Sequence, residues 1–330
     1  MVRLRKARPR SDAGIRRRRA GRGWSYRTDS GERVSAEDRE RAESLAVPPA
    51  WRDVWIAADP LAHIQAIGVD DAGRTQYRYH PHWRERRDRA KHERALDLAE
   101  SLPAMRRRVT RDLALEGLPR ERVLAAALRM LDTVAIRAGG DTYAEERGSR
   151  GLMTLLCRHA TVTGDSVRLR FPAKSGQRFD VTIEDPALAR CVEELLAGRT
   201  RSSRLLAFQD AAGLHPLRDV DLNDAVREAT GGEFTAKDFR TLHGTIVAAV
   251  SLARARDIGT KTARARAVRA AIVETSEALG NTPSVARASY IDPEVFARFE
   301  AGATIGLTGS RERALLDLLR SSTAARSTAA

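Results

Sequence analysis

The sequence predicts an α+β protein, with a small N-terminal β-rich domain followed by a larger, mainly α-helical domain. All four tryptophans lie within the first 90 residues, where short apolar stretches alternate with turn residues. From about Lys91 onward, apolar residues recur at the spacing of amphipathic helices, and one alternating strand pair interrupts them. A chain of 330 residues is long enough to form two such domains, each with its own core.

The charge balance favours a polyanionic partner. The chain carries 58 basic and 44 acidic residues, a formal net charge of +14, although an arginine-rich coding bias would also raise this number. Cys157 and Cys191 form neither a metal pattern nor a disulfide framework, so we expect the protein to reside in a reducing cytoplasm. No apolar run is long enough to span a bilayer, and the basic N-terminus lacks the apolar segment of a secretory signal.

The N-terminal region divides into two parts. Residues 1–23 are basic and punctuated by glycine and proline, which predicts a disordered arm that lies along phosphates or, alternatively, a solubilising tail. Residues 24–90 predict strands joined by turns. The segment at residues 71–73 predicts a hairpin turn between IQAIGV and TQYRY.

Residues 91–320 predict mainly helices. Pro103 suits the first turn of a helix, and a long apolar-periodic run stops at Gly139-Gly140. The alternation in VRLRF and FDVTI predicts two paired strands, with Lys174 in or near their turn. Helices then resume, and residues 321–330 predict a disordered tail.

Four residues that are far apart in the sequence form the strongest candidate site. They are Arg137 at the end of a helical run, Lys174 in FPAKSGQRF, Arg240 in TAKDFRTLHGT and Tyr290 in LGNTPSVARASYI. Each has an ordinary explanation when taken alone, as a helix cap, a turn lysine or a core aromatic. Their combination, in this order and in these settings, is what points to one site.

These side chains meet the chemical needs of metal-free cleavage of a phosphodiester bond. Tyr290 is a candidate nucleophile that would form a covalent phosphotyrosine. Arg137 and Arg240 carry planar guanidinium groups that match phosphate oxygens. Lys174 is a candidate donor of the proton that the leaving hydroxyl needs, a role for which arginine has too high a pKa.

Taken together, the four segments resemble the type IB DNA topoisomerases, in particular the small bacterial and poxvirus-like members, over residues 24–300. The resemblance implies a catalytic domain of the tyrosine recombinase and topoisomerase IB type, with Lys174 on a β-hairpin. It implies a 3′-phosphotyrosyl link to Tyr290, rotation of the nicked strand, and resealing by the free 5′-hydroxyl. It also implies no ATP, metal or other cofactor, and a nucleoid-associated monomer that clamps double-stranded DNA without any membrane partner.

Two further positions gain roles from the resemblance. Many family members carry histidine in a Gly-His-Thr-Pro segment before the tyrosine, but this chain has Asn281, which can donate a hydrogen bond to a phosphoryl oxygen but cannot carry positive charge. Lys237 precedes Arg240 by three residues and would share its helix face. Tyrosine recombinases usually have histidine at this point and topoisomerases of this type usually have lysine, so Lys237 favours the topoisomerase and is a candidate DNA contact.

The strand-like segment TQYRY is a candidate DNA-binding element. By resemblance, Gln76, Tyr77 and Tyr79 contact the duplex, and alternation places the two tyrosines on one face and Gln76 on the other. Glutamine can recognise adenine edges, and tyrosine can contact phosphates or bases.

Two other functions stay open from sequence alone. A tyrosine recombinase shares the catalytic lineage but exchanges strands within an assembly of protomers. A basic architectural protein would bind DNA without cleaving it. His80 and His82 form a lone His-x-His pair, for which we expect a structural role and not a metal site.

Overall fold

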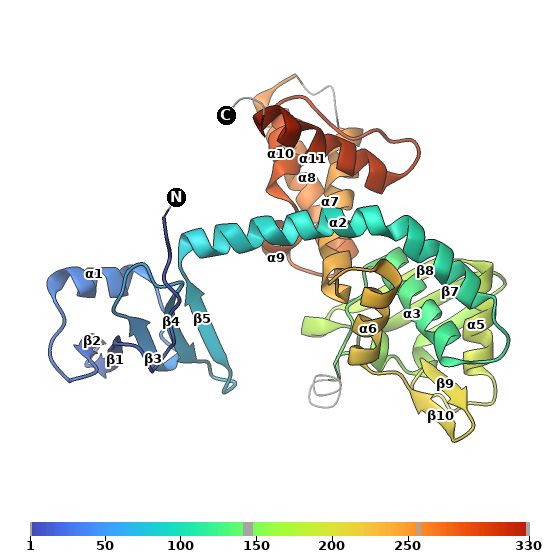
Figure 1. Ribbon diagram of the computed structural model, residues 1–330, viewed down its shortest axis with the longest axis horizontal. Coiled ribbons are helices and arrows are strands. Elements are labelled where there is room, and N and C mark those ends of the chain that lie inside the picture. The colour runs from blue at the N-terminus through green and yellow to red at the C-terminus, as the bar shows by residue number, and fades with distance from the viewer. Residues whose placement is uncertain (1, 141–147, 256–258, 328–330) are drawn as a thin grey trace. The chain divides into compact units, whose positions relative to one another are not determined.

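The computed structural model describes residues 2–140, 148–255 and 259–327 (Figure 1). The chain divides into two compact units, residues 1–90 and residues 91–330. Within the described ranges, no helix is both long enough and apolar enough to cross a membrane.

The first unit is a five-stranded antiparallel sheet with one short helix, α1 (Figure 1). The strand order is β2-β1-β3-β4-β5. Apolar side chains cover both faces of the sheet, with Ile15, Val54 and Ile56 on one and Trp55, Ala57 and Ile67 on the other. The bounds are β1 Gly14–Ala20, β2 Gly23–Thr28, α1 Ala36–Ser44, β3 Arg52–Ala57, β4 Ile64–Val69 and β5 Thr75–Tyr79.

The prediction of a disordered arm over residues 1–23 is wrong for much of that stretch. Strand β1 pairs with both β2 and β3, and the backbone of Arg5 bonds to Leu61 at 2.9 Å. Arg17 is buried, and its guanidinium donates to the carbonyls of Val47, Pro48 and Trp51. The run of four arginines did not look like a strand because arginine is rarely buried. Arg17 can be buried here because three carbonyls replace the water around its guanidinium, as a buried charge requires.

The second unit is mainly helical, and its described residues form one large apolar core and a small separate cluster of Ala248, Ile272 and Ile291. A three-stranded antiparallel sheet, β6-β7-β8, and a two-stranded sheet, β9-β10, accompany the helices (Figure 1). The helix bounds are α2 Pro81–Leu113, α3 Arg120–Val134, α5 Pro186–Leu196, α6 Asp219–Thr230, α7 Ala236–Arg254, α8 Lys261–Leu279, α9 Pro283–Ser289, α10 Pro293–Glu300 and α11 Arg311–Ser327. The strand bounds are β6 Ala160–Thr163, β7 Ser166–Pro172, β8 Arg178–Glu184, β9 Ala207–Asp210 and β10 Gly213–Pro216.

Pro103 does not begin a helix, as the sequence led us to expect, but lies inside α2. A proline in a helix interior costs about 3 kcal/mol because it removes a backbone donor and crowds the preceding turn. Pro103 itself is exposed, whereas Leu102, Met105 and Val109 are buried in the core. Burial of each such side chain stabilises the fold by about 1.5–3 kcal/mol, so the buried apolar face of α2 outweighs the cost of the proline.

At the C-terminal end, α11 continues through Ser327, whereas we had predicted disorder from residue 321. Leu315 and Leu319 of this helix are buried in the core of the second unit. Residues 328–330 of the predicted tail lie outside the described residues.

Candidate active site

Arg240 is the most deeply buried of the candidate residues, with 3% of its surface exposed. It lies in the second turn of α7, and its guanidinium donates to the carbonyl of Ala135 and, at 2.7 Å, to that of Leu279. Ala135 caps α3, and Leu279 is the last residue of α8. The negative ends of two helix dipoles therefore stabilise this buried cation, which in turn joins the ends of both helices.

Arg137 and Asn281 face each other beside this cation. Nη2 of Arg137 donates to the carbonyl of Gly280 at 3.1 Å and to Oδ1 of Asn281. Gly280 ends α8 with a φ of 57°, a left-handed conformation that glycine adopts without strain, and this turn brings Asn281 back towards Arg137. Among the described residues, the buried Nδ2 of Asn281 has no hydrogen-bond partner.

Tyr290 follows α9 directly and packs beneath Arg240. The guanidinium carbon of Arg240 lies 5.1 Å from the centre of the tyrosine ring. The carbonyl of Tyr290 accepts a hydrogen bond from Thr245 on α7 at 3.2 Å. A Cβ atom at Gly244 would lie only 2.8 Å from that carbonyl, so the glycine permits the close approach of the two segments.

The surrounding cations change the ionisation of Tyr290. Burial, the largest single influence, raises its pKa, but the charge and hydrogen bonding of Arg240, with the charges of Arg137 and Lys237, together outweigh it. The pKa of Tyr290 is therefore lower than that of an ordinary tyrosine. Burial and the neighbouring Arg137 lower the pKa of Arg240 to about 10, so Arg240 remains charged at neutral pH.

Lys174 lies in the turn between the paired strands β7 and β8, and its side chain is exposed. The turn closes through a hydrogen bond from the backbone of Ala173 to that of Gln177 at 2.7 Å. Oε1 of Gln177 lies 3.6 Å from the point where a Cβ atom on Gly280 would be. The lysine turn therefore approaches the segment that carries Asn281.

A cavity of about 250 Å³ lies between the lysine turn and Arg137, and Arg240, Asn281 and Tyr290 do not line it. Arg137 and Lys174 both line it, together with Gly139, Gly140, Ser149 and Arg150. Residues 141–147, in the same loop, lie outside the described residues. The cavity is large enough for a phosphate group with part of its attached sugar, and two of its lining side chains are candidate site residues.

Lys237 is exposed in the first turn of α7. Its neighbour Asp238 has 1% of its surface exposed and accepts hydrogen bonds from the backbone and hydroxyl of Thr235 and from Arg94 at 2.7 Å. These bonds fix the helix start that carries Lys237 and Arg240. No local sequence pattern indicates the Arg94–Asp238 pair, because 144 residues separate its partners.

The candidate DNA-binding strand lies at one edge of the sheet in the first unit, as β5. Tyr77 and Tyr79 are 46% and 36% exposed, and their rings stack with centroids 5.9 Å apart. Gln76 faces the other side, where its amide donates to Asp70 at 2.9 Å. The structure thus confirms the predicted division of this strand into two faces.

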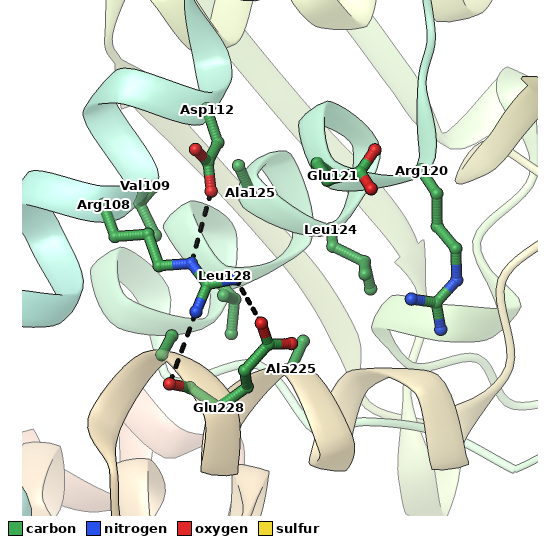
Figure 2. Close-up of a pocket in the computed structure, with 11 residues that line it drawn as sticks. Arg108, Val109, Asp112, Arg120, Glu121, Leu124, Ala125, Leu128, Ala225 and Glu228 are labelled. Carbon is green, nitrogen blue, oxygen red and sulfur yellow. Dashed lines mark hydrogen bonds and ion pairs between the residues drawn. The ribbon is translucent and has the colours of Figure 1, made fainter.

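A second pocket and the His80–His82 pair are further features of the described residues. A pocket of about 90 Å³ lies between α2, α3 and α6, where Arg108 bonds to Glu228 at 2.6 Å and to Asp112 at 3.5 Å (Figure 2). None of the candidate site residues lines it. The rings of His80 and His82 lie 5.3 Å apart, and the described part of the chain contains no cluster of three or more potential metal ligands.

Comparisons with known proteins define the class to which this fold and side-chain set belong. A family model described as "Eukaryotic DNA topoisomerase I, catalytic core" matches residues 80–301. A second, described as "Bacterial DNA topoisomerase IB, N-terminal domain", matches residues 23–70. The chain therefore belongs to the type IB DNA topoisomerases, which confirms the resemblance found in the sequence.

Individual relatives agree with this assignment. The protein named DNA topoisomerase 1B from Acanthamoeba polyphaga mimivirus is 32% identical over 287 residues, which cover 84% of this chain and 85% of that protein. DNA topoisomerase 1 from Mycosarcoma maydis and DNA topoisomerase 1 alpha from Arabidopsis thaliana are each 24% identical over 48% of this chain. The matched segment spans only 17% and 16% of those two proteins.

Proposed function

We propose that this chain relaxes supercoiled duplex DNA by cutting and resealing one strand through Tyr290, without ATP or a metal ion. The observation that carries the proposal is the position of the tyrosine ring beneath Arg240, with Arg137 and Asn281 beside that arginine. A phenol surrounded by fixed cations is suited to attack a phosphodiester, because the same cations stabilise the phenolate and the charge on the phosphoryl oxygens.

The roles of the residues follow from their chemistry. The oxygen of Tyr290 forms a bond to phosphorus while the bond from phosphorus to the 5′-oxygen breaks. Lys174 gives a proton to that leaving oxygen, and the tyrosine hydroxyl proton passes to solvent. The strand then carries a 3′-phosphotyrosyl link and a free 5′-hydroxyl. Arg137 and Arg240 donate to the phosphoryl oxygens, which carry the negative charge throughout.

Resealing reverses these steps. The phosphotyrosyl bond conserves the energy of the original phosphodiester, so the 5′-hydroxyl can displace Tyr290 without another energy source. Between cleavage and resealing the cut strand rotates about the intact one, which relaxes the supercoil. We infer that the enzyme acts as a monomer and that both units contact the same duplex, the first through Tyr77, Tyr79 and Gln76.

Asn281 donates a hydrogen bond to a phosphoryl oxygen in this scheme. Its Oδ1 accepts from Arg137, which directs the amide so that Nδ2 remains as the donor. That Nδ2 atom is buried and without a partner among the described residues, and such a group is costly unless a ligand satisfies it. The scissile phosphate is the ligand that the proposal supplies.

The test is relaxation of negatively supercoiled plasmid in EDTA without ATP, with wild type and Tyr290→Phe in parallel. The proposal requires relaxation by the wild type and none by the variant, with equal DNA binding by both proteins. Binding must be measured at the same salt concentration, because phosphate contacts are strongly salt-dependent. Normal relaxation by Tyr290→Phe would reject the nucleophile.

A further inference from the structure

One row of side chains crosses the whole sheet of the first unit. The pairing register aligns Tyr77 with Ile67, Ile67 with Trp55, and Trp55 with Arg16. It continues from Arg16 to Arg27 and from Arg27 to Arg33. Residues directly opposite each other in antiparallel strands point to the same face. The row therefore begins at an exposed tyrosine of β5 and ends in three aligned arginines at the opposite edge.

A fourth arginine joins the same face. Arg18 follows Arg16 by two residues on β1, so both side chains point the same way. We call Arg16, Arg18, Arg27 and Arg33 the arginine face. Arg18, Arg27 and Arg33 are exposed. Arg17, which lies between Arg16 and Arg18 in the strand, points to the opposite face and is buried.

The alignment of these arginines is unfavourable for the isolated protein. Like charges directly opposite each other on neighbouring strands repel. Arg27 and Arg33 face each other next to a backbone hydrogen bond from Thr28 to Glu32, the arrangement in which opposed side chains lie closest. A sheet that only had to fold would place opposite charges or neutral side chains at these positions.

Carboxylates of the protein neutralise only part of the charge on the arginine face. Arg16 pairs with Asp29 at 2.7 Å, and Arg27 bonds to the carbonyl of Gly31. Among the described residues, Arg18, Arg27 and Arg33 have no carboxylate within ion-pairing distance. The first 34 residues hold twelve basic and three acidic side chains, a net charge of +9 against +14 for the whole chain. Much of the excess charge of the protein thus lies in the stretch of sequence that carries this face.

We propose that the arginine face binds phosphates of the same duplex that Tyr77 contacts, and so lengthens the DNA segment held by the first unit. This inference rests on the proposed function, because that function makes duplex DNA the polyanion. The three unpaired arginines lie three to five strand spacings from β5, or ~14–24 Å at ~4.8 Å per strand. With the duplex axis running across the strands, this span equals ~4–7 base pairs at ~3.4 Å each.

The test compares DNA binding by a variant with Arg18→Ala, Arg27→Ala and Arg33→Ala and by its parent, both carrying Tyr290→Phe so that no strand is cut. Affinity is measured against salt concentration on a 40-base-pair duplex and on a series shortened from either end. Loss of three phosphate contacts lowers the salt slope by ~2.7. On duplexes too short to reach the arginine face, the two proteins should bind with the same slope.

Two further variants provide the controls. Arg158, Arg190 and Arg201 are exposed arginines of the second unit, and their triple alanine variant removes the same charge from elsewhere. It should keep the parental slope on the long duplex. Lysine at positions 18, 27 and 33 retains the charge and should restore the slope. Thermal melting checks folding, and the alanine variant at the arginine face should melt no lower than its parent.

An unchanged slope for the variant at the arginine face, or an equal loss in the control variant, would overturn the inference. So would a loss of slope that persists on the short duplexes. None of these results bears on Tyr290, because its role is tested by plasmid relaxation with an otherwise unaltered chain. Failure of the arginine face and failure of the proposed nucleophile are therefore separate outcomes.

Discussion

The buried and exposed parts of the candidate site differ in how they are held. Arg240 is almost completely buried, and the terminal carbonyls of two helices fix its guanidinium. Lys174 is exposed in a hairpin turn and shares only a cavity wall with Arg137. The groups that we propose stabilise charge are thus held in place by the protein itself, whereas the proposed proton donor is exposed and can follow the leaving oxygen.

This difference has a physical basis. A preorganised cation stabilises a transition state most when it need not move during the reaction. A proton donor must instead reach the oxygen whose bond breaks, and contacts of this kind often tighten only when substrate binds. The comparison predicts that substitutions in the buried part affect both stability and cleavage, whereas substitutions in the exposed part affect cleavage alone.

Arg240→Ala should have the largest effect. It removes the guanidinium that we propose binds the phosphate, and it leaves the carbonyls of Ala135 and Leu279 without their partner. We expect single-turnover cleavage to fall by about 10³-fold or more, and the free energy of unfolding to fall by about 3 kcal/mol. Arg240→Lys is the control, since it retains charge but not the planar fork. A stable and active Arg240→Ala variant would contradict the claim that the buried part of the site supports both folding and cleavage.

Lys174→Ala should reduce cleavage by about 10²–10⁴-fold, because it removes the proposed general acid. Its side chain is exposed, so the melting temperature should not change. A substrate with sulfur in place of the leaving 5′-oxygen needs no proton to depart, and it should be cleaved equally well by variant and wild type. Failure of that substrate to rescue the variant would assign Lys174 to charge stabilisation instead.

Asn281→Ala should slow cleavage by about 10–100-fold, the expected loss for one hydrogen bond to a charged group. Asn281→Asp should be slower than the alanine variant. Its carboxylate still accepts from Arg137, but it repels the phosphate where Nδ2 would donate. Equal rates for the two variants would show that the amide does not face the scissile phosphate.

The smallest effect concerns the pH dependence of Tyr290. Burial raises its pKa, but Arg240, Arg137 and Lys237 lower it by more. The phenolate should therefore form below the ordinary tyrosine pKa of about 10. Arg137→Gln removes one of these charges, so it should move the titration to higher pH. An ultraviolet titration of each protein, with its Tyr290→Phe counterpart subtracted, isolates this tyrosine, and an unmoved midpoint would contradict the electrostatic account.

The sequence revealed the strands around Lys174 in the second unit but not strand β1 of the first unit. The strands around Lys174 were visible because Val167, Leu169 and Phe171 alternate with polar residues and face the core. Strand β1 was hidden because its pattern consists of arginines, and only tertiary structure shows that Arg17 points inward. A run of basic residues indicates disorder unless the sequence also shows what could bind those residues in the interior. For Arg17 the binding groups are backbone carbonyls about 30 residues away, which no local pattern reveals.

The sequence also identified the candidate site residues but not how they are supported. Arg137, Arg240 and Tyr290 could be chosen from their chemistry and from family resemblance. Asn281 was chosen from the same resemblance, but neither its contact with Arg137 nor the carbonyls that hold Arg240 could be predicted in this way. These contacts join α7 to the ends of α3 and α8, and no local pattern encodes them.

The most direct test of the account is to identify the covalent bond between protein and DNA. Wild-type protein is mixed with a duplex labelled at one strand, quenched with SDS, digested with protease and analysed by mass spectrometry. The account predicts a nucleotide attached through its 3′-phosphate to the peptide that contains Tyr290. Attachment to another residue, or through a 5′-phosphate, would contradict it.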